Sequence, residues 1–103
     1  MRIYLCSEVK AESNYSSKLK PVNKKALSKF EAFIVKKGYK PYYGKGRDKT
    51  YIGVMVDLND DAELGTFMMQ LAKKFGCFMK VYPAVKNPGG LYDMKIILHD
   101  YKA

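Results

Sequence analysis

The densest group of chemically capable residues is the segment 42–51, YYGKGRDKTY. Its glycines, Gly44 and Gly46, would let backbone N–H groups approach an anion, and three cations beside them would neutralise its charge. The segment lacks the spacing of a P-loop and does not open a helix, which excludes that motif. The alternative is an ordinary hairpin turn with solvated side chains. The three cations are Lys45, Arg47 and Lys49.

Aromatic residues are the second feature, since nine tyrosines and five phenylalanines are interleaved with lysine. Proteins that bind single-stranded nucleic acid stack bases on such rings beside a basic groove. The RNA-recognition signature requires aromatic residues at fixed alternate positions of two strands, and neither RIYLCS (2–7) nor YIGVMV (51–56) contains it. The alternative is that these rings pack in the core and on strand surfaces.

Other nucleophiles and metal ligands are few. Cys6 and Cys77 are expected to be buried in strands and inert, and they are too few for a zinc cluster or a disulfide scaffold. His99, the sole histidine, is expected at the surface end of a strand. No serine forms a recognisable triad with it. We therefore expect neither a metal nor a bound cofactor.

Charge is concentrated in the first half of the chain. Residues 1–50 hold 13 Lys/Arg and 4 Asp/Glu, whereas residues 51–103 hold 6 of each, so the first half carries the whole net charge of +9. Such a field favours polyanionic partners. One hypothesis is therefore a small, basic, non-enzymatic module that binds nucleic acid or an acidic host protein; the alternative is a solvated surface. The candidate contacts are Lys24, Lys25, Lys45, Arg47 and Lys49.

Length and composition favour one globular domain over residues 1–103, in which 48% of the residues are hydrophobic. No apolar run approaches the roughly 20 residues that span a bilayer, and the first residues lack the apolar stretch of a secretory signal. We expect a soluble cytoplasmic protein without a membrane partner.

Hydrophobic periodicity predicts two helices. In the first, over 24–37, Leu27, Phe30 and Ile34 form an apolar face, with Asn23 as N-cap and Gly38 at the C-terminal end. The second covers 60–75, begins at Asn59, Asp60 and Asp61, and ends at Gly76. Its apolar positions are Leu64, Phe67, Met68, Leu71, Ala72 and Phe75.

Strands are expected between and around these helices. Residues 8–21 are predicted to be a loop, GKGRD (44–48) and KNPGG (86–90) are predicted turns, and Pro41 favours an edge strand for 39–43. The order β-α-β-β-α-β-β predicts an α+β, ferredoxin-like split βαβ sandwich, with one additional C-terminal strand and both helices on one face of an antiparallel sheet. Met55, Met79 and Met94, together with the tyrosines, are expected on the second face, where apolar residues would favour oligomers. The predicted strands are 2–7, 39–43, 51–57, 77–82 and 91–98.

Several short motifs, in this order and spacing, resemble the small bacteriophage S-adenosylmethionine lyases, once called SAM hydrolases. The first strand ends in YLCS (4–7), and a polar loop containing SN (13–14) follows. The remaining motifs are Val22-Asn23, G-x-x-x-Y-Y-G (38–44), Leu71-Ala72, Val81-Tyr82, Gly90-Leu91 and the tail 101–103.

This resemblance implies a ferredoxin-like homotrimer with active sites between subunits. The family cleaves S-adenosylmethionine to methylthioadenosine and homoserine lactone, which depletes the methyl donor and counters host restriction and methylation. Because the carboxylate of the substrate displaces the thioether, the enzyme needs to supply only proximity and preorganisation.

The family places a glutamate after the first helix, but this chain has no Glu between Glu31 and Glu63. Asp48 is the nearest match, one methylene shorter and flanked by Arg47 and Lys49, and it is the catalytic candidate implied by the resemblance. The candidate substrate-binding residues are Ser7, Tyr43, Thr50 and Tyr51.

Overall fold

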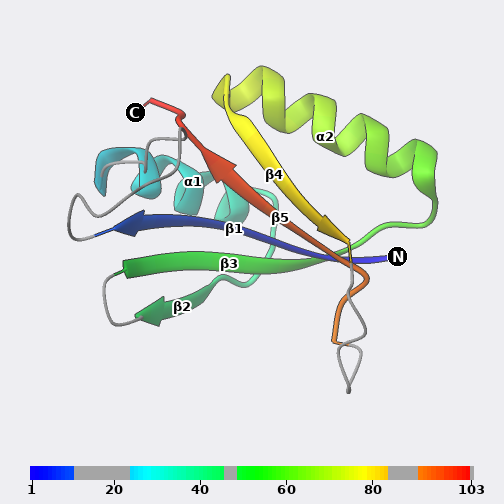
Figure 1. Ribbon diagram of the computed structural model, residues 1–103, viewed down its shortest axis with the longest axis horizontal. Helices are drawn as coiled ribbons and strands as arrows, with labels where there is room; N and C mark the ends of the chain where they lie inside the picture. Colours follow the sequence, from blue (N-terminus) through cyan, green and yellow to red (C-terminus); the bar gives the residue numbers. More distant parts are fainter. Residues whose placement is uncertain (11–23, 46–48, 84–90, 103) are drawn as a thin grey trace.

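A computed structural model describes residues 1–10, 24–45, 49–83 and 91–102. It is an α+β fold in which one sheet is backed by two helices (Figure 1). Along the chain the elements are β1 (Arg2–Lys10), α1 (Lys24–Lys36), β2 (Tyr42–Lys45), β3 (Lys49–Asp57), α2 (Asp61–Phe75), β4 (Phe78–Pro83) and β5 (Met94–His99).

The sheet has the strand order β2-β3-β1-β5-β4. Neighbouring strands are antiparallel except for β1 and β5, which are parallel, with Ile3 opposite Met94 and Ser7 opposite Leu98. The expected antiparallel sheet is therefore wrong at one ladder, and the sheet is mixed. The reason is that β5 lies between β1 and β4, and the direction that makes it antiparallel to β4 makes it parallel to β1.

Both helices pack on the same face of the sheet. The ring of Phe75 in α2 contacts Phe30 and Phe33 in α1, with ring centroids 6.1 and 5.2 Å apart. The predicted apolar face of α1 is confirmed, because Leu27, Phe30 and Ile34 are buried. The strands contribute alternate residues to this core, as a sheet covered on one side requires. These strand residues are Ile3, Leu5, Ile52, Val54, Val56, Ile96 and Leu98.

The ends of the helices follow their capping signals. The Asp60 carboxylate accepts a hydrogen bond from the Glu63 backbone N–H at 2.9 Å, and the Glu63 carboxylate accepts one from the Asn59 N–H at 3.0 Å. The pair is a variant of the capping box, in which the Glu63 side chain bonds the N–H of the residue before the N-cap Asp60, and it begins α2. Gly76 and Gly38 adopt left-handed backbone conformations, with φ of 54° and 84°, and end α2 and α1 as predicted. Asn23, the expected N-cap of α1, lies outside the described residues.

The second strand differs most from its predicted position, since β2 begins at Tyr42 and not at residue 39. The Tyr39 N–H bonds to the carbonyl of Ile34, and the Tyr39 side chain packs against the core. The chain therefore still closes the end of α1 where the sequence predicted a strand. The predicted turns reach into residues 46–48 and 84–90, and the predicted loop into 11–23, all outside the described residues.

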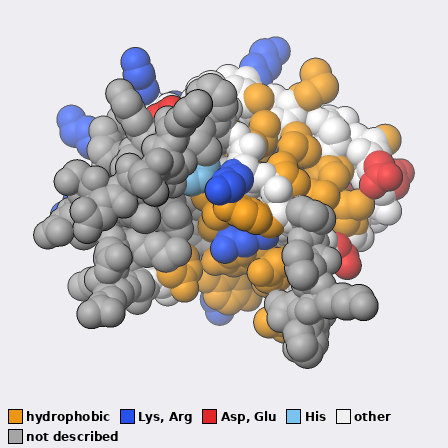
Figure 2. Space-filling model, viewed as in Figure 1, with side chains coloured by type: hydrophobic (Ala, Val, Ile, Leu, Met, Phe, Trp, Pro, Cys, Tyr) orange, Lys and Arg blue, Asp and Glu red, His pale blue; other side chains and the backbone are white. Residues whose placement is uncertain are grey.

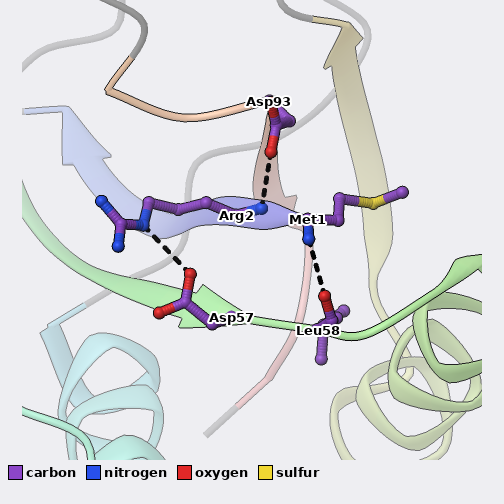
Figure 3. Close-up of polar contacts among 5 residues, drawn as sticks. All are labelled: Met1, Arg2, Asp57, Leu58 and Asp93. Carbon is purple, nitrogen blue, oxygen red and sulfur yellow. Dashed lines mark hydrogen bonds and ion pairs between the residues drawn. The ribbon is translucent and has the colours of Figure 1, made fainter.

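Polar contacts join three segments at the start of β1 (Figure 3). The Arg2 backbone N–H donates to the Asp93 carboxylate at 2.8 Å, and the Arg2 side chain donates to Asp57 at 3.0 Å. The Met1 nitrogen donates to the carbonyl of Leu58 at 2.7 Å. Arg2 and Asp57 are both exposed, so their ion pair contributes little stability. The backbone contacts fix the start of β1 between the end of β3 and the approach to β5.

Candidate functional site

The residues predicted to form a substrate pocket are divided between the two faces of the sheet. Ser7 and Tyr43 both lie opposite Ile52 in the ladders, which places them on the helix-covered face. Thr50 is two positions from Ile52 and has the same orientation. Tyr51 points to the opposite face, so it does not join the other three. Asp48 lies outside the described residues.

Ser7 belongs to the core. Its side chain is 0% exposed, and its hydroxyl is 2.6 Å from the hydroxyl of Tyr101, which is 3% exposed. Burial raises the pKa of Tyr101 far above its ordinary value, because the phenolate would lose its hydration. The Ser7 hydroxyl is thus committed to an internal hydrogen bond and does not form the floor of an open pocket.

Tyr43 is an accessible residue of the predicted pocket, with 65% of its surface exposed. A hydrogen bond to Glu31 of α1 raises the pKa of the Tyr43 phenol. The Glu31 carboxylate is therefore directed toward β2. Sequence reasoning did not assign Glu31 to the pocket, because the contact depends on how α1 lies over β2.

The predicted polyanion contacts are only partly described. Lys24 and Lys25 are exposed at the start of α1. Lys45 and Lys49 occupy backbone positions at the ends of β2 and β3, but their side chains and the whole of Arg47 lie outside the described part of the chain. The predicted cluster of these five cations therefore stays a prediction.

The face of the sheet opposite the helices carries most of the described tyrosines. Among the described elements, no helix covers this face, and Figure 2 shows hydrophobic side chains around Lys or Arg side chains on it. Cys6 and Ile97 are buried at its centre, and the prediction that Cys6 is buried is confirmed. We call the following set the tyrosine face: Tyr4, Tyr42, Tyr51, Tyr82 and Tyr92, with Lys80 and Lys95.

Glycines hold two of these rings close to the sheet. A β-carbon on Gly53 would lie 2.5 Å from the Tyr4 hydroxyl, and one on Gly44 would overlap the Tyr51 ring. Each ring therefore lies across a glycine of the neighbouring strand, an arrangement that covers exposed backbone at positions without a side chain. Tyr92 stacks on Tyr4, with centroids 5.6 Å apart and an interplanar angle of 25°. The result is a layer of flat aromatic surface.

Two lysines lie beside these rings. The Lys95 ammonium is 5.7 Å from the centroid of Tyr4, and the Lys80 ammonium is 5.2 Å from that of Tyr82. Both distances are within the range of cation–π attraction. The face therefore presents cationic groups next to aromatic surface, and Tyr42 and Tyr82 are its most exposed described rings, at 55% and 38%.

The methionine prediction failed for a related reason. Met55 lies on the tyrosine face, opposite Tyr4, but Met79 and Met94 pack against the core on the helix-covered face. The sequence shows that successive side chains of a strand point to opposite faces of the sheet. Which half of them faces the helices depends on the register between strands. The tyrosines expected on this face fared better, because five of them lie there, whereas Tyr43 lies on the helix-covered face.

The remaining chemistry of the described residues is limited. His99 is buried and not at the surface, which corrects its predicted position. Cys77 precedes β4, whereas the sequence predicted it within a strand, and its side chain is half-buried. Burial raises the pKa of its thiol and so disfavours the nucleophilic thiolate. Within the described ranges, no group of three His, Cys, Asp or Glu side chains is placed to hold a metal ion. No helix described here has the length and apolar character needed to cross a bilayer.

No protein-family model, curated protein or solved structure matches the chain.

Proposed function

We propose that the protein binds single-stranded nucleic acid through the tyrosine face. The observation that carries this proposal is that five tyrosines lie on one face, one from each of the strands β1 to β4 and Tyr92 from just before β5. Lysine ammonium groups lie over two of these rings. Bases of any sequence stack on such rings, while lysines contact the phosphate backbone.

Stacking is expected to contribute more than charge at this face. Lys80, Lys95 and Arg2 are its described cations, and Asp57 and Asp93 both contact Arg2, which leaves a small positive excess. Each base stacked on a ring contributes about 1–3 kcal/mol. The net charge of +9 adds a general attraction for a polyanion.

The direct test is titration of the protein against a fluorescent single-stranded oligonucleotide and its duplex, followed by anisotropy. Tyr42→Ala and Tyr82→Ala should each weaken single-strand binding by about 5- to 150-fold, the equivalent of one lost stack. Tyr43→Ala is the matched comparison, because Tyr43 adjoins Tyr42 in β2 but lies on the opposite face. Equal losses from Tyr42→Ala and Tyr43→Ala would refute the proposed interface.

The salt dependence separates this interface from a general lysine surface. If Lys80 and Lys95 make the phosphate contacts, the logarithm of the affinity should fall with the logarithm of salt concentration with a slope of about −1.4. Contacts from five lysines would give a slope of about −3.5. A slope near the steeper value would assign the binding to another surface.

The finer fold assignment, a ferredoxin-like frame, is part of this proposal. The order β1-α1-β2-β3-α2-β4 supports it, as does the adjacency of β2, β3 and β1. In this description β5 is an insertion between β1 and β4.

The second candidate function is that of an S-adenosylmethionine lyase. The contact between Glu31 and Tyr43 favours it, because a carboxylate beside an accessible ring suits a cationic sulfonium substrate. In this reaction the substrate's carboxylate oxygen bonds to the carbon attached to sulfur, and the carbon–sulfur bond breaks. The electron pair leaves on methylthioadenosine, and homoserine lactone forms without a metal or an external co-reactant.

Mass spectrometry after incubation with S-adenosylmethionine tests this second candidate. Methylthioadenosine and homoserine lactone should appear, Asp48→Asn should abolish them, and Tyr43→Ala should reduce them while Tyr42→Ala does not. Sedimentation would test the homotrimer that the resemblance implies. An intact substrate would reject the lyase without affecting the nucleic-acid proposal.

A further inference from the structure

A cleft runs between α1 and α2 on their solvent-facing side, away from the tyrosine face. Phe33 and Ala32 give it an apolar floor, and the stems of the surrounding lysines extend that floor. Sequence reasoning did not identify this cleft, because its residues come from two helices separated in the chain. The lining residues are Lys29, Ala32, Phe33, Lys36, Lys37, Gln70, Lys73 and Lys74.

Aromatic packing fixes the shape of the cleft. Phe33 meets Phe75 edge to face, with a centroid distance of 5.2 Å. The Lys29 ammonium is 5.4 Å from the Phe75 ring, and that of Lys37 is 5.8 Å from the Phe33 ring. The cations are therefore held around an aromatic floor that is itself anchored in the core.

The electrostatics of the cleft have one sign. Five of its lining residues are lysines, and none is acidic. Glu31, the acidic residue of α1, is engaged by Tyr43 toward β2. Lys73 and Lys74 also lie in the last turn of α2, where the helix dipole favours cations. Charge complementarity therefore favours an anionic partner.

The apolar floor distinguishes between two kinds of anion. A duplex would meet the lysines through its backbone but would leave the Phe33 and Ala32 surface covered only by phosphate and sugar. A single strand would find one partly buried ring here, whereas the tyrosine face offers it several rings, Tyr42 and Tyr82 among them exposed. An acidic peptide that carries one apolar side chain satisfies both features, because the side chain covers the floor while carboxylates meet the rim. We propose that this cleft docks an acidic, apolar-anchored segment of a partner protein.

This surface is separate from the tyrosine face, because the helices and the sheet lie between them. The two proposals can therefore fail independently. If both hold, the molecule can carry a protein partner on its helices while its sheet contacts nucleic acid.

The probe is a synthetic peptide of about 15 residues, rich in Glu and Asp, with a central leucine. We would follow binding by amide chemical shifts of the full chain. Shifts should move along α1 and α2 and stay fixed on the tyrosine face. Replacing the leucine by glycine, or the acids by Gln and Asn, should weaken binding by about tenfold or more.

Charge-reversed variants provide the matched comparison. Lys73→Glu/Lys74→Glu changes two residues that line the cleft, and Lys40→Glu/Lys102→Glu makes the same change on exposed residues outside the lining. The first pair should weaken peptide binding by about tenfold and the second by no more than about threefold. Unchanged circular dichroism would confirm that both variants fold.

Three outcomes would overturn the proposal. Equal losses from the two variants would indicate diffuse attraction, and equal binding of the leucine and glycine peptides would show that the floor is not used. Cleft shifts that depend on protein concentration without peptide would assign the surface to a second copy of the chain.

Discussion

The hydrogen bond between Ser7 and Tyr101 allows a quantitative test of whether Ser7 belongs to the core. Both side chains are buried, and their hydroxyl oxygens are 2.6 Å apart. Tyr101→Phe keeps the ring but leaves the Ser7 hydroxyl without this partner. Ser7→Ala leaves the phenol in the same position. A buried hydroxyl that loses its partner costs about 1–3 kcal/mol, so each single variant should lose that much unfolding free energy.

The double variant should lose less than the sum of the two single variants. Once both hydroxyls are gone, no buried polar group is left unsatisfied, so the two losses are coupled by about 0.5–3 kcal/mol. Urea denaturation followed by circular dichroism measures all four free energies, and each lost kcal/mol should also lower the Tm by about 4–8 °C.

Additive losses would refute the internal hydrogen bond. A Ser7→Ala variant with normal stability but reduced affinity for S-adenosylmethionine would go further, because it would return Ser7 to a binding pocket. Titration calorimetry with that ligand on the folded variant provides this second readout.

Three more predictions concern stability. Burial raises the folded-state pKa of Tyr101 above the value of about 10 in the unfolded chain, so above pH 10 the unfolded chain loses this proton first. The unfolding free energy should therefore fall by about 1.4 kcal/mol per pH unit above pH 10. Tyr101→Phe should remove that part of the loss, as measured by urea titrations at several pH values. Asp60→Ala should cost about 0.5–2 kcal/mol through the lost cap of α2, whereas Asp60→Asn should cost less; equal losses in urea denaturation would argue against the cap. Gly44→Ala should cost about 1–3 kcal/mol because its β-carbon enters the space of the Tyr51 ring, and the variant Tyr51→Ala should tolerate it better in the same assay.

Local signals were sufficient to predict both helices. Capping groups and a 3.6-residue period are properties of neighbouring residues, and they located α2 within one residue of its observed start. The ends of the strands were predicted less accurately, because a strand continues only as far as its neighbouring strand pairs with it. β1 continues to Lys10 through residues that read as a polar loop, since β3 pairs with it as far as Lys49.

Long-range pairing explains the features that were not predicted. The position of β5 beside β1 joins residues from opposite ends of the chain, and no local pattern encodes that contact. The face of the sheet on which Tyr51 and Met79 lie also depends on long-range pairing. If a strand were shifted by one residue against its neighbour, every one of its side chains would point to the other face. The lysine cleft combines two helices whose relative placement is set by contacts between Phe33 and Phe75.

The position of β5 between β1 and β4 has a consequence for how the protein is made. β1 leaves the ribosome first, and β3 can pair with one of its edges after about fifty more residues. Its other edge must wait for β5, because Arg2 and Asp93 are separated by 91 positions. At about 5–20 residues per second, that edge remains open for roughly 5–20 s. An unpaired edge can pair with another chain, so each nascent molecule passes through a stage in which its most central strand is its most vulnerable one.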